Sequence, residues 1–320
     1  MKPKDLRPIK LSLAIAMLVT MMPIVPVYGQ DNEEETANLD VIVITGTRRQ
    51  DRTVADTAVP IDILDFEQLT ATGQTELNQI LSTLLPSFNF PLPSVTDGTD
   101  HVRPATLRGL SPDHTLVLVN GKRRHTSALL NVNGSVGRGS SAVDLNTIPV
   151  SAIQRIEILR DGAAAQYGSD AIAGVINVVL KDARQGGSIS ATVGQHSTTL
   201  DGVPELRSTS IVDNGLDFAT SGERDVSDGE TYTVSGNIGL PLGDDGFFNI
   251  SAEYRERNPT NRSGFDPRQN YPADADGNLD PRETSFDRIN HRFGNADVED
   301  VNVFYNAGYA INDDWELYSF

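Results

Sequence analysis

The acidic segment Asp274–Asp280 is the part of this sequence that most resembles a metal-binding motif. Asp274, Asp276 and Asn278 alternate along the chain as the first ligands of a calcium-binding loop do. Leu279, however, occupies the position where the sharp turn of such a loop requires glycine, and Ser285 replaces the bidentate glutamate. We therefore interpret the segment as a polar loop and predict no metal site.

The remaining side chains that could do chemistry form no catalytic constellation. The 5 histidines are scattered, and the chain has no cysteine for a nucleophile, a disulfide or a thiolate site. Gly134, Gly137 and Gly139 lie in a polar segment and do not lead from a strand into a helix, as a dinucleotide site requires. The sequence thus predicts neither enzyme activity nor a cofactor.

The composition of the chain argues against some classes of partner and of fold. The formal net charge of -18 argues against nucleic acid, whose phosphates require Lys and Arg. A mean hydropathy of -0.28 excludes a bundle of membrane helices. It does not exclude a transmembrane β-barrel, because barrel strands alternate between apolar and polar residues.

The first residues predict export. A basic region is followed by an apolar run, Leu11–Met22, that is too short to span a bilayer. Two prolines and a small residue, Gly29, come next, so we predict a secretory signal peptide over residues 1–29. Residues 30–50 begin polar and acidic and predict a flexible tether.

One strand is predicted within this tether. Five β-branched residues occupy positions 41–45 and are followed by Gly46: Val41, Ile42, Val43, Ile44 and Thr45. A strand on a flexible tether is suited to adding onto the sheet edge of another protein. An ordinary edge strand of the next domain is the alternative.

Residues 51–181 predict a small α/β domain. A strand over residues 59–64 precedes a helix capped by Asp65, and Thr75 is expected to cap a second helix with an apolar stripe. Residues 86–104 predict a loop, and Asn120-Gly121 predicts a tight turn after a strand over 115–119. Pro149 suits the first turn of a helix reaching residue 153. Residues 155–181 predict a strand, a small-residue turn and a fully buried strand.

From residue 187 the pattern changes to strict alternation. About five strands are predicted up to residue 320, each with one apolar and one polar face, although Phe304 falls on the polar face of its strand. Tight turns are expected at 243–246 and 312–314, and long loops at 200–229 and 258–298. Short turns on one side and long loops on the other are typical of outer-membrane barrels.

Four motifs resemble those of TonB-dependent outer-membrane receptors, in the order of that family. They are the strand 41–45, which resembles a Ton box, and three segments of the α/β domain: Arg108-Gly-Leu with Thr115–Gly121, Asp144–Pro149, and Arg155–Lys181. The resemblance implies an α+β plug domain followed by the first strands of a transmembrane β-barrel of about 22 strands. It also implies that the chain stops inside the barrel.

The resemblance assigns roles to particular residues. Residues 41–45 would pair with TonB, which works with the ExbB/ExbD energising complex. Arg108 and Arg160 match plug arginines that face barrel carboxylates. Four basic residues match the outward tip of the plug, where they could contact an anionic substrate: Lys122, Arg123, Arg124 and His125.

The function implied is energy-coupled uptake of a scarce ligand, with a ferric siderophore or similar iron complex as the commonest cargo of the family. The expected setting is the outer membrane of a Gram-negative bacterium, where a monomer contacts lipid and lipopolysaccharide and holds its N-terminus on the periplasmic side. The alternative is a secreted or periplasmic α/β binding module, or a decayed receptor, that is complete at 320 residues and transports nothing.

Overall fold

The structure, a computed structural model, describes residues 61–320 except for 90, 97, 133–135, 161–163 and 313. The predicted signal peptide and the strand 41–45 therefore lie outside the described residues. The described residues all belong to one structural unit, residues 42–320. None of the helices in this described part is long and apolar enough to cross a membrane.

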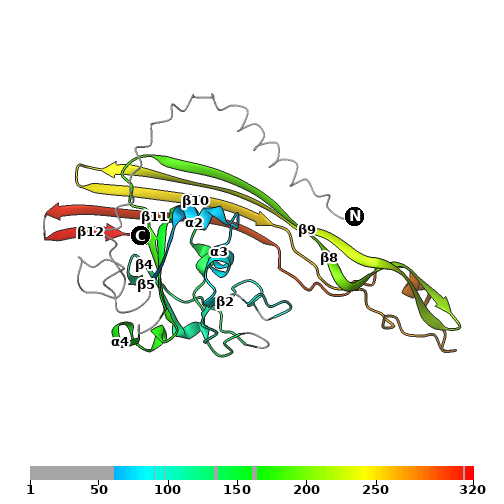
Figure 1. Ribbon diagram of the computed structural model, residues 1–320. Helices are drawn as coiled ribbons and strands as arrows, with labels where there is room; N and C mark the ends of the chain where they lie inside the picture. Colours follow the sequence, from blue (N-terminus) through cyan, green and yellow to red (C-terminus); the bar gives the residue numbers. More distant parts are fainter. Residues whose placement is uncertain (1–60, 90, 97, 133–135, 161–163, 313) are drawn as a thin grey trace, which may run out of the picture. The chain divides into compact units, whose positions relative to one another are not determined.

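An α/β domain comes first (Figure 1), and its five-stranded sheet has the order β1-β6-β7-β4-β5. Its strands are β1 (Ile61–Asp65), β4 (Thr115–Val119), β5 (Lys122–Arg123), β6 (Ile153–Leu159) and β7 (Gly174–Leu180). A separate pair joins β2 (Phe88–Asn89) to β3 (Thr106–Leu107). Short helices connect them: α2 (Phe66–Ala71), α3 (Leu77–Leu84), α4 (Ala164–Tyr167), and the 3-10 turns η2 (Pro112–His114), η3 (Leu145–Thr147), η4 (Val150–Ala152) and η5 (Ser169–Ala171).

Most of the predicted local signals are confirmed. Asp65 and Gln68 form a capping box at α2, and the apolar stripe of α3 is buried in the domain core. Asn120 and Gly121 both have positive φ, which is the geometry of the tight hairpin turn that joins β4 to β5. Strand β7 is buried almost throughout, as its uninterrupted apolar sequence predicts.

Three local predictions are wrong. The residue before α3 is Glu76 rather than Thr75, and its side chain does not cap the helix. Pro149 precedes only a short 3-10 turn, because β6 already begins at Ile153 and leaves no room for a helix. The segment 86–104 is not entirely loop, since Phe88 and Asn89 pair with Thr106 and Leu107.

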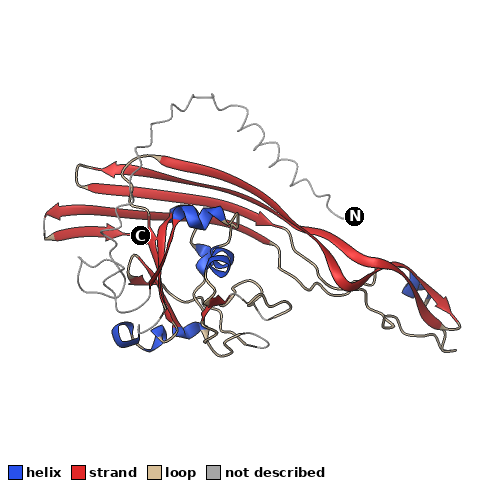
Figure 2. Cartoon of the chain, viewed as in Figure 1, coloured by secondary structure: helices blue, strands red, loops and turns tan. Residues whose placement is uncertain are grey.

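The second part is an antiparallel sheet in sequence order, which we call the long sheet (Figure 2). It comprises β8 (Gly187–Val212), β9 (Gly215–Leu242), β10 (Gly246–Arg257), β11 (Val298–Asn312) and β12 (Trp315–Ser319). The five predicted strands and both tight turns are thus confirmed. The segment 258–297 between β10 and β11 is irregular apart from the 3-10 turn η6 (Pro281–Thr284).

The predicted loop at 200–229 is wrong. Strands β8 and β9 continue to a turn at Asp213 and Asn214, and they pair along most of that length. A strand needs only about 9–11 residues to cross a bilayer, whereas β8 has 26 residues and β9 has 28. The extension is mostly polar and partly exposed, and the segment 258–297 packs against it through Phe218 and Arg224. Polarity alone therefore does not distinguish it from a loop.

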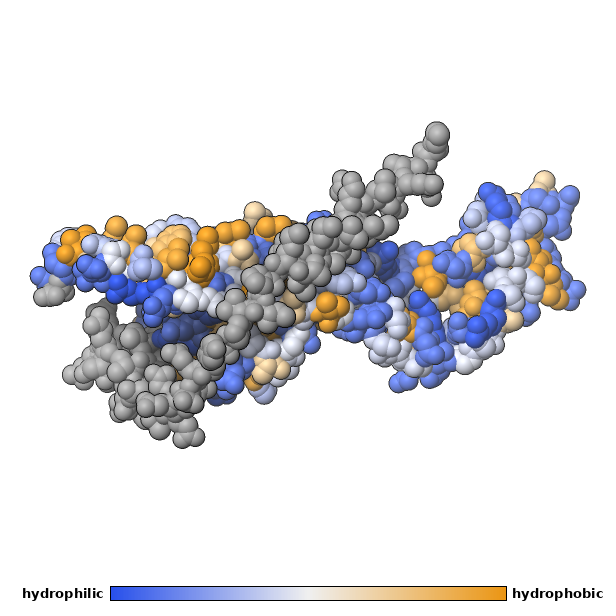
Figure 3. All heavy atoms as spheres, turned by 90° about the horizontal axis from the view of Figure 1, so that it is seen from above, coloured by the Kyte–Doolittle hydropathy of each residue, from blue (hydrophilic) through white to orange (hydrophobic). Residues whose placement is uncertain are grey.

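One face of the long sheet is apolar and exposed. Hydrophobic residues gather over the end that holds the tight turns, while the opposite end is largely hydrophilic (Figure 3). The exposed apolar side chains include Ile189, Val193, Val301, Val303, Ile311 and Leu317. An uncovered apolar surface of this extent marks contact with a protein or a membrane.

Candidate functional site

The inward face of β10 is polar and covered by the α/β domain. Alternate residues of this strand are buried: Asn249, Ser251, Glu253, Arg255 and Arg257. Their neighbours Phe248, Ile250 and Tyr254 point to the opposite, apolar face. The period of two predicted from the sequence is present, and here the polar face packs against protein.

Two charged side chains at the end of β10 form what we call the outer contact. Arg257 makes an ion pair with Glu76, the residue that precedes α3. Arg255 donates one hydrogen bond to the carbonyl of Thr75, at 3.3 Å, and another to Asp300, at 2.5 Å. The side chains of Arg257 and Glu76 are only 7% and 5% exposed, so this pair is buried between the α/β domain and the long sheet.

The outer contact also reaches the base of the segment 258–297. Arg257 donates to the carbonyl of Ala296 at 3.1 Å, and Arg103 donates to the side chain of Asn295 at 2.9 Å. Ser94 donates to the carbonyl of Gly294 at 3.3 Å. The C-terminal end of the segment is therefore held to the α/β domain.

Two polar cavities adjoin the outer contact. One, of about 340 Å³, is lined by Arg103, Asp144 and residues of β11. The other, of about 230 Å³, is lined by residues 73–79 and by β8 and β9. Glu76 and Arg257 line both cavities. Burial raises the pKa of the Asp144 carboxyl, so the first cavity contains an acid that gives up its proton less readily than usual.

Uncharged amides form a second group of contacts, which we call the inner contact. Asn306 of β11 donates to the carbonyl of Lys181 at 3.0 Å and accepts from Asn120 at 3.1 Å. Asn249 donates to the carbonyl of Ala183 at 3.4 Å. These bonds surround residues 181–186, which connect β7 to β8.

Phe304 explains the apparent break in the pattern of β11. Its ring packs against the core of the α/β domain, and the guanidinium of Arg124 lies 5.7 Å from the ring centroid. Phe304 is thus apolar because the polar face of β11 contacts the hydrophobic core of the α/β domain at this position.

The arginines singled out from the sequence lie within the α/β domain. Arg160 forms an ion pair with Asp62 at 2.6 Å, and Arg108 donates to the carbonyl of Arg160 at 3.2 Å. Their pairing with carboxylates of further barrel strands stays a prediction. The buried ion pair that joins the two parts has the opposite arrangement, because the arginine, Arg257, is on the sheet and the carboxylate, Glu76, is on the domain.

The basic segment 122–125 follows the β4–β5 turn. Lys122 lies 5.1 Å from the ring centroid of Tyr318 in β12, and Arg123 forms an ion pair with Asp170. Tyr318 pairs with Gly308, close to the tight turn between β11 and β12. Segment 92–103, by contrast, contacts residues 294 and 295, which belong to the segment 258–297 just before β11. Substrate contact by residues 122–125 stays a prediction.

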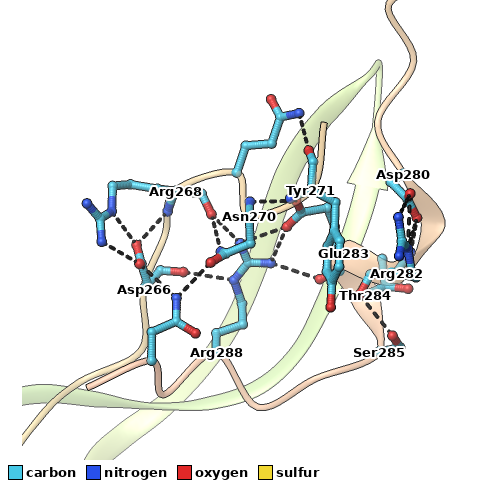
Figure 4. A network of polar contacts seen from close by, with 12 residues as sticks. Asp266, Arg268, Asn270, Tyr271, Asp280, Arg282, Glu283, Thr284, Ser285 and Arg288 are labelled. Carbon is cyan, nitrogen blue, oxygen red and sulfur yellow. Dashed lines mark hydrogen bonds and ion pairs between the residues drawn. The ribbon is translucent and has the colours of Figure 1, made fainter. Parts of the chain in front are cut away.

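A second buried ion pair organises the segment 258–297 (Figure 4). Arg288 and Glu283 are fully buried, and the Glu283 carboxylate accepts from the backbone N–H groups of Asn270 and Tyr271, both at 2.6 Å. Burial alone would raise the pKa of Glu283, but these hydrogen bonds and Arg288 lower it overall. The Arg288 guanidinium also lies about 5 Å from the ring centroids of Phe218 and Phe286.

This ion pair joins the segment to the extended hairpin, because Phe218 belongs to β9. Asn214, at the turn of the hairpin, donates to the carbonyl of Gly277 at 2.8 Å and accepts from Leu279 at 2.9 Å. Asp274, the first residue of the calcium-like segment, instead accepts hydrogen bonds from residues 276 and 278. The hairpin and the segment therefore form one folded unit.

Sequence reasoning missed the outer contact. Its signal was the alternation of Glu253, Arg255 and Arg257 on the polar face of one strand, where Asn and Ser precede them. Charges at every second residue require buried partners when that face is covered. Glu76 could not be identified as the partner, because 181 positions separate it from Arg257.

Comparison with known proteins shows which proteins the chain is similar to. Residues 53–175 match the TonB-dependent Receptor Plug Domain family. The vitamin B12 transporter BtuB of Vibrio cholerae serotype O1 is 32% identical over 190 residues, covering 58% of this chain and 27% of that protein. The probable TonB-dependent siderophore receptor PirA of Acinetobacter baumannii is 26% identical over 241 residues, covering 72% of this chain and 28% of that protein.

Among solved structures, the ferric enterobactin receptor PfeA of Pseudomonas aeruginosa is similar with a TM-score of 0.46 and 20% identity, over 80% of this chain and 32% of that chain. The chain thus spans less than a third of the length of these relatives, which are named as transporters and receptors. The matched segment contains the α/β domain from β1 to the start of β7. The α/β domain, over residues 53–175, thus matches the plug domain of TonB-dependent receptors, and we call it the plug below.

Proposed function

We propose that the complete protein imports a scarce ligand across the outer membrane of a Gram-negative bacterium, with TonB and the ExbB/ExbD complex supplying energy. One observation supports this most directly. The plug covers the polar face of a sheet whose opposite face is apolar and exposed. A sheet with lipid on one side and a plug on the other is what a plugged membrane barrel requires.

In this proposal the tight turns lie in the periplasm, and the extended hairpin with the segment 258–297 lies outside the cell. The N-terminus and residues 41–45 lie on the periplasmic side, where TonB adds a strand to them. Ligand binding at the outer end increases the population in which residues 41–45 are available.

A ferric siderophore or similar iron complex is the proposed ligand, since two of the relatives are named for siderophores. Cobalamin is the second candidate, because a relative with 32% identity is named a vitamin B12 transporter.

Uptake by whole cells tests the proposal. The full-length protein is produced in cells that lack their own receptors, with and without TonB, and given ⁵⁵Fe-enterobactin or ⁵⁷Co-cyanocobalamin. Accumulation of one label only when TonB is present supports the proposal and identifies the ligand class. Surface binding with no TonB-dependent accumulation of either label, or of labelled haem and citrate complexes, contradicts uptake.

A further inference from the structure

The outer and inner contacts differ in charge and in what surrounds them. The inner contact consists of uncharged amides around residues 181–186, where the chain itself joins plug to sheet. The outer contact is centred on a buried ion pair between residues 181 positions apart, with Arg255 bonded to the carbonyl of Thr75 beside it. Among the described residues, the chain crosses between plug and sheet at residues 181–186 and not at this contact. The chain segment 181–186 therefore limits movement of the plug away from the sheet at the inner contact, but not at the outer contact.

The cavities determine how easily the outer contact can separate. Opening a buried ion pair is costly mainly because each charge is left without water or a partner. Here cavities of about 340 Å³ and 230 Å³ adjoin both Glu76 and Arg257. A water molecule needs only about 10–15 Å³ of such volume, so each cavity can supply several waters to the separated charges.

The pair of Arg288 and Glu283 provides the contrast. Its guanidinium is enclosed by the rings of Phe218 and Phe286 and donates to the carbonyls of Asp266 and Arg268, at 2.8 Å and 2.5 Å. Both of its side chains are 0% exposed. Two ion pairs of the same residue types thus have different surroundings, and only the one between plug and sheet adjoins the polar cavities described above.

We propose that Glu76 and Arg257 are positioning residues that hold the outer edge of the plug against β10, and that this ion pair opens and closes in the native protein while the inner contact stays formed. The proposal deepens the transport function proposed above, since a plug displaced at its outer edge would expose a polar route along β10. Neither ligand nor TonB is required for the opening itself.

Hydrogen exchange measured by mass spectrometry on the full-length protein in detergent micelles tests this. The variant Glu76→Gln should speed exchange in residues 73–84 by about tenfold or more, because it removes the charge that holds the outer edge. Exchange in β7 and in the first half of β10 should not change. The double variant Glu76→Arg with Arg257→Glu restores an ion pair and should return exchange toward the wild-type rate.

Two controls separate this role from a general loss of stability. Glu283→Gln breaks the other buried ion pair and should speed exchange only in residues 266–290 and the hairpin. Arg257→Lys keeps the charge and serves if Glu76→Gln fails to fold, with a smaller acceleration expected in residues 73–84. Equal acceleration in β7, no acceleration in residues 73–84, or no recovery in the reversed pair would overturn the proposal. Because the measurement uses no ligand, its failure would leave the uptake test unaffected.

Discussion

Arg257, the last residue of β10, forms a buried ion pair with Glu76, the residue before helix α3. The same arginine donates to the carbonyl of Ala296, at the end of the segment that begins immediately after it. One guanidinium thus joins the plug, the sheet and both ends of the segment 258–297. Its position explains why the charges of β10 lie at the outer end of the strand and the neutral amides at the inner end.

Gly174 should be among the least replaceable glycines of the plug. It has a φ of +143°, and a Cβ placed there would lie 2.5 Å from the carbonyl oxygen of Leu159. We expect Gly174→Ala to destabilise the plug by about 3 kcal/mol or more, because both backbone strain and a clash with the neighbouring strand are introduced. Gly73→Ala is the matched control. It has positive φ but no atom within 4 Å, so a loss of about 1 kcal/mol is expected. Chemical denaturation compares the two, and equal losses would contradict the argument.

The pair of Glu283 and Arg288 should stabilise the segment 258–297 specifically. Replacing one partner leaves a buried charge uncompensated, which costs about 3–5 kcal/mol. We therefore expect Glu283→Gln to make this segment susceptible to limited proteolysis while the plug remains resistant. The exposed pair of Arg207 and Glu205 is the control, because exposed ion pairs contribute little. Cleavage inside the plug at the same rate would show that the effect is not local.

Acid should loosen the same segment. Arg282 hydrogen-bonds Asp280 and lowers the pKa of that carboxyl to about 2, and the pKa of Glu283 is lowered as well. A carboxyl with a lower pKa in the folded state contributes stability above its unfolded pKa and loses it as the pH falls through the folded value. Exchange in residues 266–290 should therefore accelerate between about pH 4.5 and pH 2. The Glu283→Gln variant should show a weaker dependence on pH, and an unchanged dependence would exclude Glu283 as a contributor.

The apolar face of the long sheet should tolerate no charge if it faces lipid. Lysine near the bilayer midplane costs a barrel about 2–4 kcal/mol, so Val303→Lys should reduce the amount of folded protein recovered in outer membranes. Val212→Lys places the same charge at the tip of the extended hairpin, where the valine side chain is exposed. It should be nearly neutral, and similar losses for both variants would argue against lipid contact at Val303.

Residues 41–45 should bind TonB as an added strand. Proline removes a backbone N–H and is poorly tolerated inside a paired strand. Ile42→Pro with Val43→Pro should therefore abolish retention of the TonB C-terminal domain by a peptide of residues 30–50. A double substitution to threonine keeps the strand propensity and should keep most of the binding. Retention unaffected by proline would eliminate strand addition at this segment.

The predictions that held were those in which one short segment determines its own geometry. Asp65 and Gln68 cap α2 by contacts within the segment, and Asn120-Gly121 closes its hairpin in the same way. The alternation along β10 is likewise local. Family resemblance then supplied what local pattern cannot, namely that the α/β domain is a plug.

The wrong predictions concern residues whose structure is determined by contacts with residues far away in the sequence. The polar sequence of residues 200–229 predicts a loop, yet these residues form a paired hairpin against the segment 258–297, whose Arg288 contacts Phe218. Thr75 has the residue type of a helix cap, but its carbonyl instead accepts from Arg255. The partner of Arg257 could not be found from the sequence either, because Glu76 reaches it only after the plug packs on the sheet.

Alternate residues of β10 belong to two different surroundings, and this has an evolutionary consequence. Positions 248, 250, 252 and 254 need only remain apolar or small, so they should drift independently among relatives. Positions 255 and 257 are bonded to residues 75, 76 and 300, and position 249 is bonded to residue 183. Substitutions at positions 257 and 76 in particular should be correlated among homologues. The apolar-face positions of β10 should then vary independently of one another, while its polar-face positions vary together with residues of the plug.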